Sequence, residues 1–377
     1  MIMRNLAKKI NFYKKLNLYR YPYQIAKRKG KYIQIKGQSL INFASNDYLG
    51  IASSKKANKI ISEAFLKYDS SSSSSKLICG NYSEICEAEK AYSQFFGYED
   101  AMLFPSGYQA NLAIISGLFN KEDKIVFDKH AHSSIIKGII LSGAEYHGFN
   151  HNCISHLSER LLRFKDVCVI TESLFSMDGD ILKVQEMKEL KKKHHFFCIV
   201  DEAHAFGVLG EKGKGIARDV ADIAVGTLGK AFGFFGAFVL MSKSIKEYLF
   251  NFSSPVIYST AVPPAFAVAA KELLFLVSNS EKERKRLKEI SNLARKRLKE
   301  EGFNVGGDAH IVPLIIGPEE RSIIISQELM KKGIFAPPVR YPTVPLGKAI
   351  IRINLTALHD EEDIEHLIKG LKDVWNK

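Results

Sequence analysis

The composition and charge of the chain describe an ordinary globular protein with a basic surface. Of its 377 residues, 46% are hydrophobic and 25% are charged, and 54 Lys and Arg against 41 Asp and Glu give a net charge of +13. These values exclude a disordered chain, and at roughly 100–200 residues per domain the length predicts two or three folded units. The longest apolar run, from Ala231 to Met241, covers eleven residues, about half of the ~20 that a membrane span needs.

The N-terminus and the cysteines show no feature of an exported protein. The first fifteen residues lack the continuous apolar stretch and the small-residue cleavage site of a signal peptide, so we expect a cytoplasmic protein. The five cysteines are odd in number and have no CxxC spacing. They predict reduced thiols, and neither a disulfide framework nor a thiolate zinc site.

The positive charge allows two interpretations: a nucleic-acid or membrane-surface protein, or a site for acidic small molecules or acidic protein partners. Its densest block, from Glu281 to Glu301, mixes acids among the bases and places apolar residues at three- and four-residue steps. That pattern is typical of an amphipathic helix with a solvated face. We therefore expect a lysine-rich surface, with no nucleic-acid partner and no membrane partner.

Short apolar runs between residues 101 and 240 alternate with helical patterns. We interpret the runs as buried strands, because several are almost continuously apolar, as strands covered on both faces are. The expected strands are Ala101–Phe104, Lys124–Phe127, Val167–Thr171, Phe197–Val200, Ile223–Thr227 and Gly236–Leu240. The expected helices between them are Tyr108–Leu118, Ser133–Leu141 and Val184–Lys193. The class is therefore α/β, with a mostly parallel sheet in a large domain.

After Thr260 the pattern changes to that of a smaller α+β unit. Its expected elements are a helix from about Pro263 to Val277, the charged helix, strands at Ile311–Ile316 and Ile350–Leu355, and helices at Ser322–Lys332 and Glu361–Val374. We expect three parts: an N-terminal arm (1–45), a large domain (46–278) and a small C-terminal domain (279–377).

Three segments place polar groups where strands of the predicted sheet end, the edge at which α/β folds bind ligands. The first segment, GTLGKAFG (226–233), contains Thr227 and Lys230. A lysine between glycines after a buried strand is a candidate for chemistry, and an exposed turn lysine is the ordinary alternative. A P-loop is excluded, because Ala231 follows Lys230 where GxxxxGK[ST] requires Ser or Thr.

The second segment, VDEAHAFG (200–207), places Asp201 and His204 three residues apart at a strand end. Each has an ordinary alternative, a helix N-cap for Asp201 and a structural histidine for His204. With His130 and His132 they are also metal-ligand types. Because HExxH spacing is absent, we expect no metal site.

The third segment, FPSGYQAN (104–111), runs from a strand through Ser106 and Gly107 into a helix. Unpaired backbone N–H groups at a helix N-terminus can bind phosphate, and a simple helix cap is the alternative. Together the three segments supply a lysine for a Schiff base, an acid that keeps a pyridinium nitrogen protonated, and a phosphate site. These are the parts that pyridoxal 5'-phosphate requires.

Nearly the whole chain resembles the α-oxoamine synthases, which are fold-type I pyridoxal phosphate enzymes. The matching segments, in the family's order and spacing, are NFASNDYLG (42–50), FPSGYQAN, TESLFSMDGD (171–180), DEAHAFGVLGEKGKG (201–215), GTLGKAFG and IYSTAVPPA (257–265). The stretch YPTVPLGKAIIRINLTALH (341–359), with YSTAVPPA, is most similar to the members that condense L-alanine with a pimeloyl thioester in biotin synthesis.

The resemblance implies a catalytic set around the cofactor ring. Lys230 would form the Schiff base, and Asp201 would pair with the pyridine nitrogen. His204 would hydrogen-bond the phenolic oxygen, and His132 would stack on the ring.

The resemblance also implies the phosphate contacts and the lining of the site. Backbone groups of Gly107 and Tyr108, the side chain of Thr227 and, from the other subunit, Thr260 would hold the phosphate. Glu172 and Ser176 would line the site near the ring.

The family reaction and substrate contacts follow from the same resemblance. Arg352 would clamp the substrate carboxylate with its planar fork, and Asn46 would lie close to the amino acid. Lys230 would remove the Cα proton of L-alanine, the pimeloyl thioester on coenzyme A or acyl carrier protein would be attacked, and carbon dioxide would leave. Since active sites in this family lie at a dimer interface, we expect a homodimer with shared sites.

The run Ser70–Ser75 allows two interpretations and departs from the family. By composition it is a flexible linker. In the family a GSGGSR-type loop is common there, so Ser75 and Lys76 would occupy the Ser and Arg positions, although serine does not adopt positive φ freely. Nearby, Ile85 and Ala88 stand where histidine and leucine are common. We expect these changes to alter acyl-chain or carrier contacts.

Two alternatives to this reaction stay open. A sister synthase would take glycine with acetyl-CoA, or serine with a longer acyl-CoA, and a few pocket contacts choose the amino acid. A basic nucleic-acid-binding protein on a decayed enzyme scaffold would be colourless and would bind with steep salt dependence.

Overall fold

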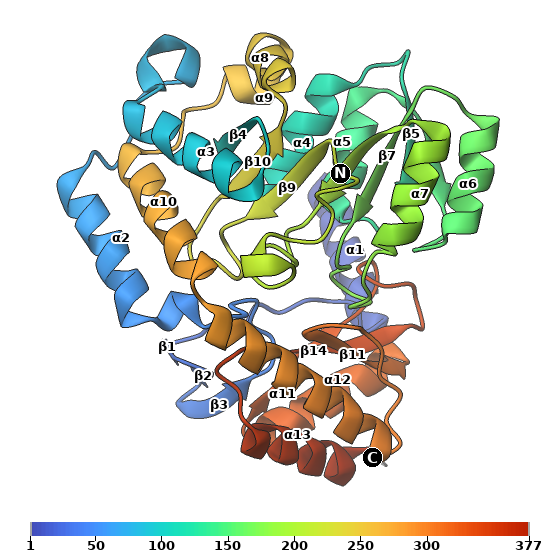
Figure 1. Ribbon diagram of the computed structural model, residues 1–377. Coiled ribbons are helices and arrows are strands. Elements are labelled where there is room, and N and C mark those ends of the chain that lie inside the picture. The colour runs from blue at the N-terminus through green and yellow to red at the C-terminus, as the bar shows by residue number, and fades with distance from the viewer. Residues whose placement is uncertain (1, 376–377) are drawn as a thin grey trace. The chain divides into compact units, whose positions relative to one another are not determined.

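The computed structural model describes residues 2–375, with side chains described from residue 5 onward. The chain divides into two compact units. Unit 1 contains residues 1–50, 177–180 and 285–377, and unit 2 contains residues 51–176 and 181–284. Figure 1 labels their helices and strands in chain order.

Unit 2 is built on a seven-stranded sheet with the strand order β4-β10-β9-β8-β7-β5-β6. The strands are β4 (Asp100–Phe104), β5 (Lys124–Asp128), β6 (Glu145–Phe149), β7 (Val167–Glu172), β8 (Phe197–Asp201), β9 (Ile223–Thr227) and β10 (Ala237–Met241). Neighbours from β9 to β6 are parallel, and only β10 runs against its neighbours β4 and β9. The predicted α/β class and the mostly parallel sheet are confirmed. Strand β6 was not predicted.

Helices join these strands and cover both faces of the sheet (Figure 1). The helices of unit 2 are α2 (Lys55–Lys67), α3 (Ser83–Phe96), α4 (Gly107–Leu118), α5 (Ser133–Ser142), α6 (Ile154–Arg163), α7 (Val184–His194), α8 (Lys243–Phe252), α9 (Ser254–Ile257) and α10 (Pro264–Ser278). Helix α4 packs on α5, and α10 packs on α2 and α3.

Alternating side chains of β10 show why the sheet is buried on both faces. Val239 and its two same-face neighbours join the apolar cluster that includes residues of α4 and α5. Phe238 points to the opposite face, where its ring meets Tyr92 and Phe96 of α3 and Phe206, at centroid distances of 4.7, 5.2 and 5.3 Å. A central strand with two buried faces needs apolar residues at every position, which explains the continuous run in the sequence.

The sheet gathers several loops at one edge. Strands β4, β5, β7, β8 and β9 point the same way, so the loops that follow them leave from the carboxyl edge. These loops carry the segments that the sequence singled out: residues 104–107, 129–132, 173–176, 201–207 and 227–233. In open α/β sheets this is where ligands bind.

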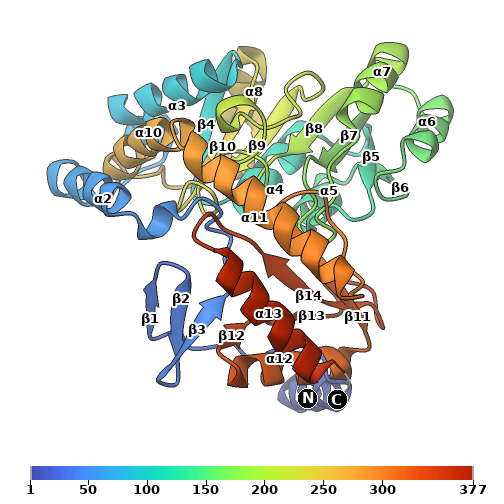
Figure 2. The same cartoon turned by 60° about the horizontal axis from the view of Figure 1, so that its bottom comes forward.

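Unit 1 combines the beginning and the end of the chain. Its strands β1 (Lys27–Lys29), β2 (Tyr32–Ile35), β3 (Gln38–Asn42) and β12 (Ile334–Phe335) form one sheet, and β11 (Ile311–Gly317), β14 (Ala349–Asn354) and β13 (Pro338–Val339) form another. Its helices are α1 (Ile2–Lys15), α12 (Glu319–Lys331), α13 (Glu361–Val374) and most of α11 (Glu281–Glu300). Figure 2 shows the first sheet and the C-terminal helices.

Long-range pairing explains why the first 50 residues belong with the C-terminal ones. Strand β12 pairs in parallel with β3, with Ile334 opposite Ile41. Lys31 reaches the N-terminus of α13, where its Nζ lies 2.5 Å from Asp360 and 2.7 Å from Asp363. The division expected from the sequence places residues 1–45 and 279–377 in separate parts. That division stays a prediction.

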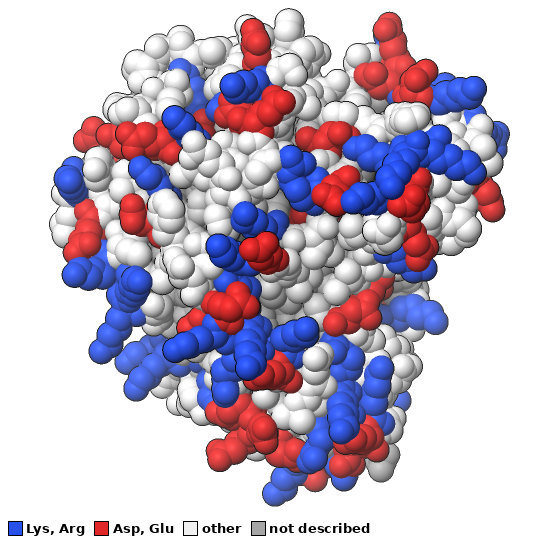
Figure 3. Space-filling model, viewed as in Figure 1, with Lys and Arg blue, Asp and Glu red and all other residues white. Residues whose placement is uncertain are grey.

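The charged helix α11 has the amphipathic form that the sequence indicates. Leu287, Ile290, Ala294 and Leu298 are buried on one side, whereas pairs such as Lys296 and Glu300, 3.8 Å apart, lie exposed. Figure 3 shows Lys and Arg interspersed with Asp and Glu over the viewed face. None of the helices within residues 2–375 combines the length and the apolar composition that a membrane crossing needs.

The close contact at Gly226 gives a test of the packing. Gly226 lies in β9 opposite Phe238, and a Cβ added there would lie 2.3 Å from the Phe238 ring. We expect Gly226→Ala to lower the free energy of unfolding by about 1–3 kcal/mol, measured by denaturant titration. In the Gly226→Ala/Phe238→Leu double variant, part of this loss should disappear. Fully additive losses would contradict the contact.

Candidate active site

Lys230 is held in a tight turn after β9. Gly233 has φ +62°, and a Cβ there would lie 2.3 Å from the backbone nitrogen of Ala52, so the turn requires glycine. Lys230 is half-buried, and its Nζ lies 2.7 Å from Nε2 of His204. The interpretation of Lys230 as an ordinary exposed turn residue is therefore wrong, and two residues from separate predicted segments meet.

Asp201 ends β8 as a nearly buried carboxylate, 7% exposed. Its Oδ2 accepts a hydrogen bond of 2.8 Å from Nδ2 of Asn111, and its Oδ1 accepts one of 2.9 Å from the Ala203 backbone. A turn follows Asp201, so the helix-cap alternative is wrong. Asn111 was not recognised from the sequence as a site residue.

Glu172 lies beside Asp201, because β7 and β8 pair in parallel with these two residues in register. Burial and the negative charge of Asp201 raise the pKa of Glu172 well above its ordinary value, against an opposing effect of Lys230. The Glu172 carboxylate accepts a hydrogen bond of 2.6 Å from the backbone N–H of His132. It thus fixes the loop that carries this histidine.

His132 stands at the N-terminus of α5. Its Nδ1 lies 2.7 Å from Oγ of Ser134, and the Tyr108 ring meets it edge-on at a centroid distance of 6.3 Å. Partial removal of water lowers the pKa of His132; Asp201 opposes this shift and Lys230 adds to it. His132 as a whole residue is exposed, whereas its ring nitrogen Nδ1 is engaged by Ser134.

The N-terminus of α4 lies next to Thr227. Ser106 caps the helix, with its Oγ accepting a hydrogen bond of 3.2 Å from Gln109. A Cβ on Gly107 would lie 3.8 Å from Cβ of Thr227, so the first and third sequence segments meet here. Thr227 Oγ1 accepts a hydrogen bond of 3.2 Å from the Gly229 backbone N–H. Helix N–H groups beside a hydroxyl suit a phosphate.

This arrangement fits pyridoxal phosphate. A lysine amine, a buried carboxylate, a histidine ring and a helix N-terminus lie along one edge of the sheet of unit 2. The residue types match the aldehyde, the pyridine nitrogen, the ring face and the phosphate of that cofactor. Ser176, also expected here, lies half-buried in the turn after β7.

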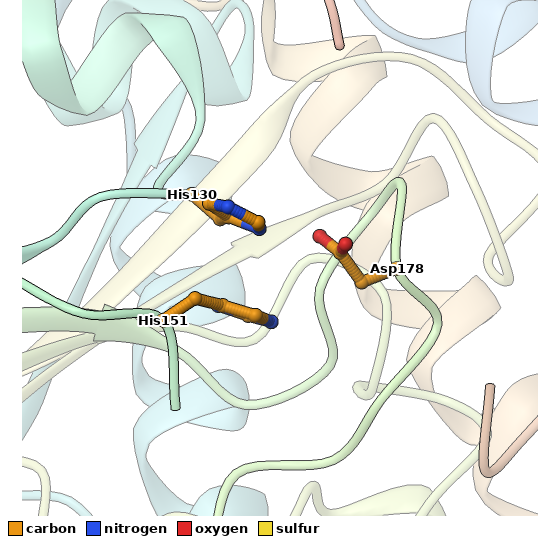
Figure 4. A group of neighbouring side chains, drawn as sticks. All are labelled: His130, His151 and Asp178. Atoms are coloured by element: carbon orange, nitrogen blue, oxygen red, sulfur yellow. The ribbon is translucent and has the colours of Figure 1, made fainter. Parts of the chain in front are cut away.

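The residues considered as metal ligands have other partners. Asp201 is engaged with Asn111, His204 with Lys230, and His132 with Ser134. His130 stacks on His151 at a centroid distance of 4.1 Å with rings 10° from parallel (Figure 4). His151 is hydrogen-bonded to the buried Asp128 at 3.0 Å, and Asp178, also drawn in Figure 4, belongs to unit 1.

Unit 1 supplies the predicted substrate residues. Oδ1 of Asn46 accepts hydrogen bonds from Tyr48 at 3.0 Å, from Arg352 at 3.1 Å and from Asn354 at 3.1 Å. The structure therefore brings Asn46 and Arg352 into contact and adds Tyr48 and Asn354, which the sequence did not indicate; their roles toward a substrate stay predictions. Asn354 is fully buried and keeps the Asn46 amide in one orientation.

A cavity of about 700 Å³ within unit 1 adjoins this network. Its lining combines aromatic, apolar and basic side chains: Lys14, Tyr19, Arg20, Tyr21, Tyr23, Ile323, Pro338, Arg340 and Arg352. Arg20 donates a hydrogen bond of 3.1 Å to Thr343. Among these aromatic, apolar and basic side chains, only Arg352 belongs to a segment that the sequence singled out. The others come from the N-terminal arm, α12 and the region around β13, which carry no motif, so the cavity was not predicted.

The serine run is part of the folded structure, and its interpretation as a flexible linker is wrong. Oγ of Ser72, 1% exposed, donates a hydrogen bond of 2.6 Å to the carbonyl of Ala261. Ser75 forms a β-bridge with Thr260, so the structure places the expected Thr260 beside this loop. Ser73 adopts φ +52°, the conformation that glycine takes more readily.

A family model and several known proteins match most of this chain. The family model "Aminotransferase class I and II" matches residues 38–371. An 8-amino-7-oxononanoate synthase of Saccharophagus degradans is 34% identical over 385 residues, covering 99% of this chain and 96% of that protein.

Two solved structures extend the likeness. A serine palmitoyltransferase from S. paucimobilis, with a bound PLP–myriocin aldimine, superposes with a TM-score of 0.91 at 26% identity and covers 99% of this chain and 97% of its own. An 8-amino-7-oxononanoate synthase from Francisella tularensis gives a TM-score of 0.78 at 31% identity, with 89% and 97% covered. The expected fold type is confirmed.

Glu202, next to Asp201, gives a test of the electrostatics. It is 1% exposed and accepts hydrogen bonds from the backbones of Ile216 and Ala217. Burial raises its pKa to about 7, above the 4.5 of an ordinary glutamate, so the folded state holds a proton that the unfolded state has released. Stability from this group is present below pH 4.5 and is lost as the pH rises to 7, by an amount on the order of 3 kcal/mol.

The measurement is the unfolding free energy of wild type minus that of Glu202→Gln across pH 4.5–8. Other titrating groups cancel in this difference, which should fall with rising pH and then level off above pH 7. A flat difference would contradict the assignment.

Proposed function

The chain belongs to the class I and II aminotransferase family and, within it, to the α-oxoamine synthases, whose cofactor is pyridoxal 5'-phosphate; from this we propose that it is an 8-amino-7-oxononanoate synthase. The reaction is the decarboxylative condensation of L-alanine with a pimeloyl thioester, which yields 8-amino-7-oxononanoate, carbon dioxide and a free thiol. The observation that supports the chemistry best is the meeting of Lys230, His204 and Asp201 at one sheet edge.

The residues of unit 2 would hold the cofactor. Lys230 would bind its aldehyde carbon, Asp201 its pyridine nitrogen, and the N–H groups of Gly107 and Tyr108 with Thr227 its phosphate. Bound there, the cofactor would supply an electron sink for the electron pair left on the amino acid when its Cα proton is removed. His204, at 2.7 Å, keeps the Lys230 amine in place.

The chain's own groups move and orient the proton and the substrate. The Lys230 amine, once displaced by the amino acid, is the base for the Cα proton. His132, an exposed residue, would stack its ring on the cofactor. Arg352, fixed by Asn46 at 3.1 Å, would bind a carboxylate in bidentate fashion.

The cavity of unit 1 supports a dicarboxylic acyl donor. A pimeloyl chain carries a carboxylate at its free end, whereas acetyl and palmitoyl groups are neutral. The cavity wall holds the arginines Arg20 and Arg340 besides Arg352, among tyrosine rings and apolar side chains. Aliphatic carbons would pack on the rings and the terminal carboxylate would meet an arginine.

The second candidate is a synthase that takes serine with a long acyl-CoA. The serine palmitoyltransferase with a TM-score of 0.91 favours it on structure, whereas the 34% identical relative favours alanine and pimeloyl. We further propose a homodimer in which Thr260 reaches the partner's phosphate site, and a cytoplasmic enzyme served by coenzyme A or acyl carrier protein. Free-thiol release with each pairing of amino acid and thioester separates the candidates, and faster turnover of serine with palmitoyl-CoA would overturn the proposal.

Replacing Lys230 tests the cofactor chemistry. We expect the wild-type protein to purify with visible cofactor absorbance. Lys230→Ala should lose the absorbance that survives dialysis, and turnover should fall by about 10²–10⁴-fold or more, because both the covalent anchor and the base are gone. The matched control is Lys137→Ala, on the exposed side of α5, which should keep both. A colourless wild type that binds DNA would favour the nucleic-acid alternative.

Replacing Arg20 tests the acyl cavity. We expect Arg20→Leu to raise KM for pimeloyl-CoA about tenfold, the equivalent of one charged hydrogen bond, while KM for L-alanine changes less than about twofold. The matched control is the methyl ester of pimeloyl-CoA, whose neutral end should give the same KM with both proteins. An equal effect on ester and acid would show that Arg20 has a structural role only.

A further inference from the structure

A continuous chain of hydrogen bonds links the two residues that flank the predicted cofactor ring. It runs from Oδ2 of Asp201 to Nδ2 of Asn111 over 2.8 Å, from there to Oγ of Ser134 over 2.9 Å, and on to Nδ1 of His132 over 2.7 Å. All four residues belong to unit 2. Asn111 is 2% exposed and Ser134 is fully buried, so water does not compete for these bonds.

The direction of each hydrogen bond in the chain follows from its ends. Carboxylate oxygens accept, so the Asn111 amide group must donate to Asp201, and its second hydrogen is then directed to Ser134. The Ser134 oxygen accepts that bond and still carries one hydroxyl hydrogen, which can be donated to Nδ1 of His132 at 2.7 Å. The Ser134 backbone N–H also points at Nδ1, at 3.3 Å. Two donors therefore face the same ring nitrogen.

We propose that Asn111 and Ser134 are positioning residues that fix His132 as the neutral tautomer with its proton on Nε2. A proton on Nδ1 would face the Ser134 backbone N–H, which can only donate, and would turn the hydroxyl hydrogen away from the ring, so both the other neutral tautomer and the imidazolium are disfavoured. Nε2–H is then the one hydrogen-bond donor of the ring.

The unused acceptor of Asn111 supports a role for its amide nitrogen. Oδ1 of Asn111 is buried and has no hydrogen-bond partner among residues 2–375. A buried unsatisfied acceptor costs about 1–3 kcal/mol, which a leucine of similar volume would avoid. The asparagine therefore stabilises the fold less than an apolar residue of similar volume would. What it provides instead are the two hydrogen bonds that its N–H groups donate to Asp201 and Ser134.

The charges around the His132 ring do not determine its tautomer, so the hydrogen bonds do. Asp201 favours a protonated ring, whereas Lys230 and loss of water oppose it. Glu172 contacts the backbone of His132 and not its ring, and Tyr108 meets the ring edge-on. Opposing electrostatic effects of this kind do not select a tautomer, whereas the two donors at Nδ1 do.

The consequence for catalysis rests on the proposed function. A ring of fixed tautomer and orientation would stack on the cofactor with a neutral face and present Nε2–H to the bound substrate. Since the same chain holds Asp201, a change at Ser134 or Asn111 reaches both sides of the cofactor ring. The effect should appear in catalysis with both substrates.

The tautomer of His132 can be measured directly by NMR. Long-range ¹H–¹⁵N spectra of the full-length, cofactor-loaded protein with ¹⁵N-labelled histidine report the tautomer, and the signals missing in His132→Asn identify His132. We expect the Nε2–H pattern in wild type. In Ser134→Ala we expect a tautomer mixture and a titration midpoint raised by about one pH unit, because one bond to the neutral ring is lost. Asn111→Leu should raise the midpoint in the same direction.

Matched variants separate positioning from folding. Ser133→Ala, at the exposed neighbouring serine, should leave the His132 signals unchanged, and Ser134→Thr, which keeps a hydroxyl, should restore the wild-type pattern. In turnover, kcat/KM should fall about tenfold in Ser134→Ala. An Nδ1–H pattern in wild type, or unchanged His132 signals in Ser134→Ala, would overturn the inference. These readings need no turnover, so a failure of the proposed substrates would be seen separately.

Discussion

The carboxylate of Asp201, almost fully buried at the end of β8, is the charge on which the site of unit 2 depends. A buried charge is costly unless donors surround it. The parallel sheet brings those donors: the turn after β8 gives the Ala203 N–H, and α4 gives Asn111. Because β9 lies next to β8, the turn that carries Lys230 lies at the same edge of the sheet. There the Lys230 amine contacts His204, which lies in the loop that follows Asp201. The end of β8 therefore brings together groups from two loops and from helix α4.

Two further buried acids, Glu172 and Glu202, lie beside Asp201, and burial disfavours their charged forms. Glu172 is in register with Asp201 on β7, and burial with this like charge raises the pKa of Glu172. Glu202 follows Asp201 directly, and burial raises its pKa to about 7. Burial therefore disfavours the charged form of both acids, and each accepts a hydrogen bond from the backbone of a loop. These two acids thus hold loops in place through backbone hydrogen bonds, whereas Asp201 is bound by the Asn111 amide and the Ala203 N–H.

The sequence predicted the centre of the fold and of the site, and the missing parts have physical reasons. The strands from 101 to 240 were found because both faces are buried, whereas β6, a partly exposed edge strand, has no apolar run. The motifs at the ends of β8 and β9 made Asp201, His204 and Lys230 recognisable. Asn111 and Ser134 are polar residues inside helices, where no sequence pattern distinguishes them. Their role depends on the packing of α4 against α5, which no local pattern encodes. The pairing of β3 with β12 is equally non-local.

The departures from the family motifs are explained by packing in unit 2. Ile85 and Ala88, where histidine and leucine are common in the family, are fully buried in α3, so they act in the core and not on a substrate surface. Lys76, at the expected arginine position, is paired with the buried Glu89, which also binds Lys246 at 3.0 Å. One carboxylate is thus shared by two lysines, and Glu89 further accepts a hydrogen bond of 2.8 Å from the Leu103 backbone N–H. Lys76 follows directly after the serine loop that pairs with Thr260, so this ion cluster holds the end of the loop by charge. The altered residues therefore have two structural places: Ile85 and Ala88 pack in the core of unit 2, and Lys76 joins the serine loop to Glu89.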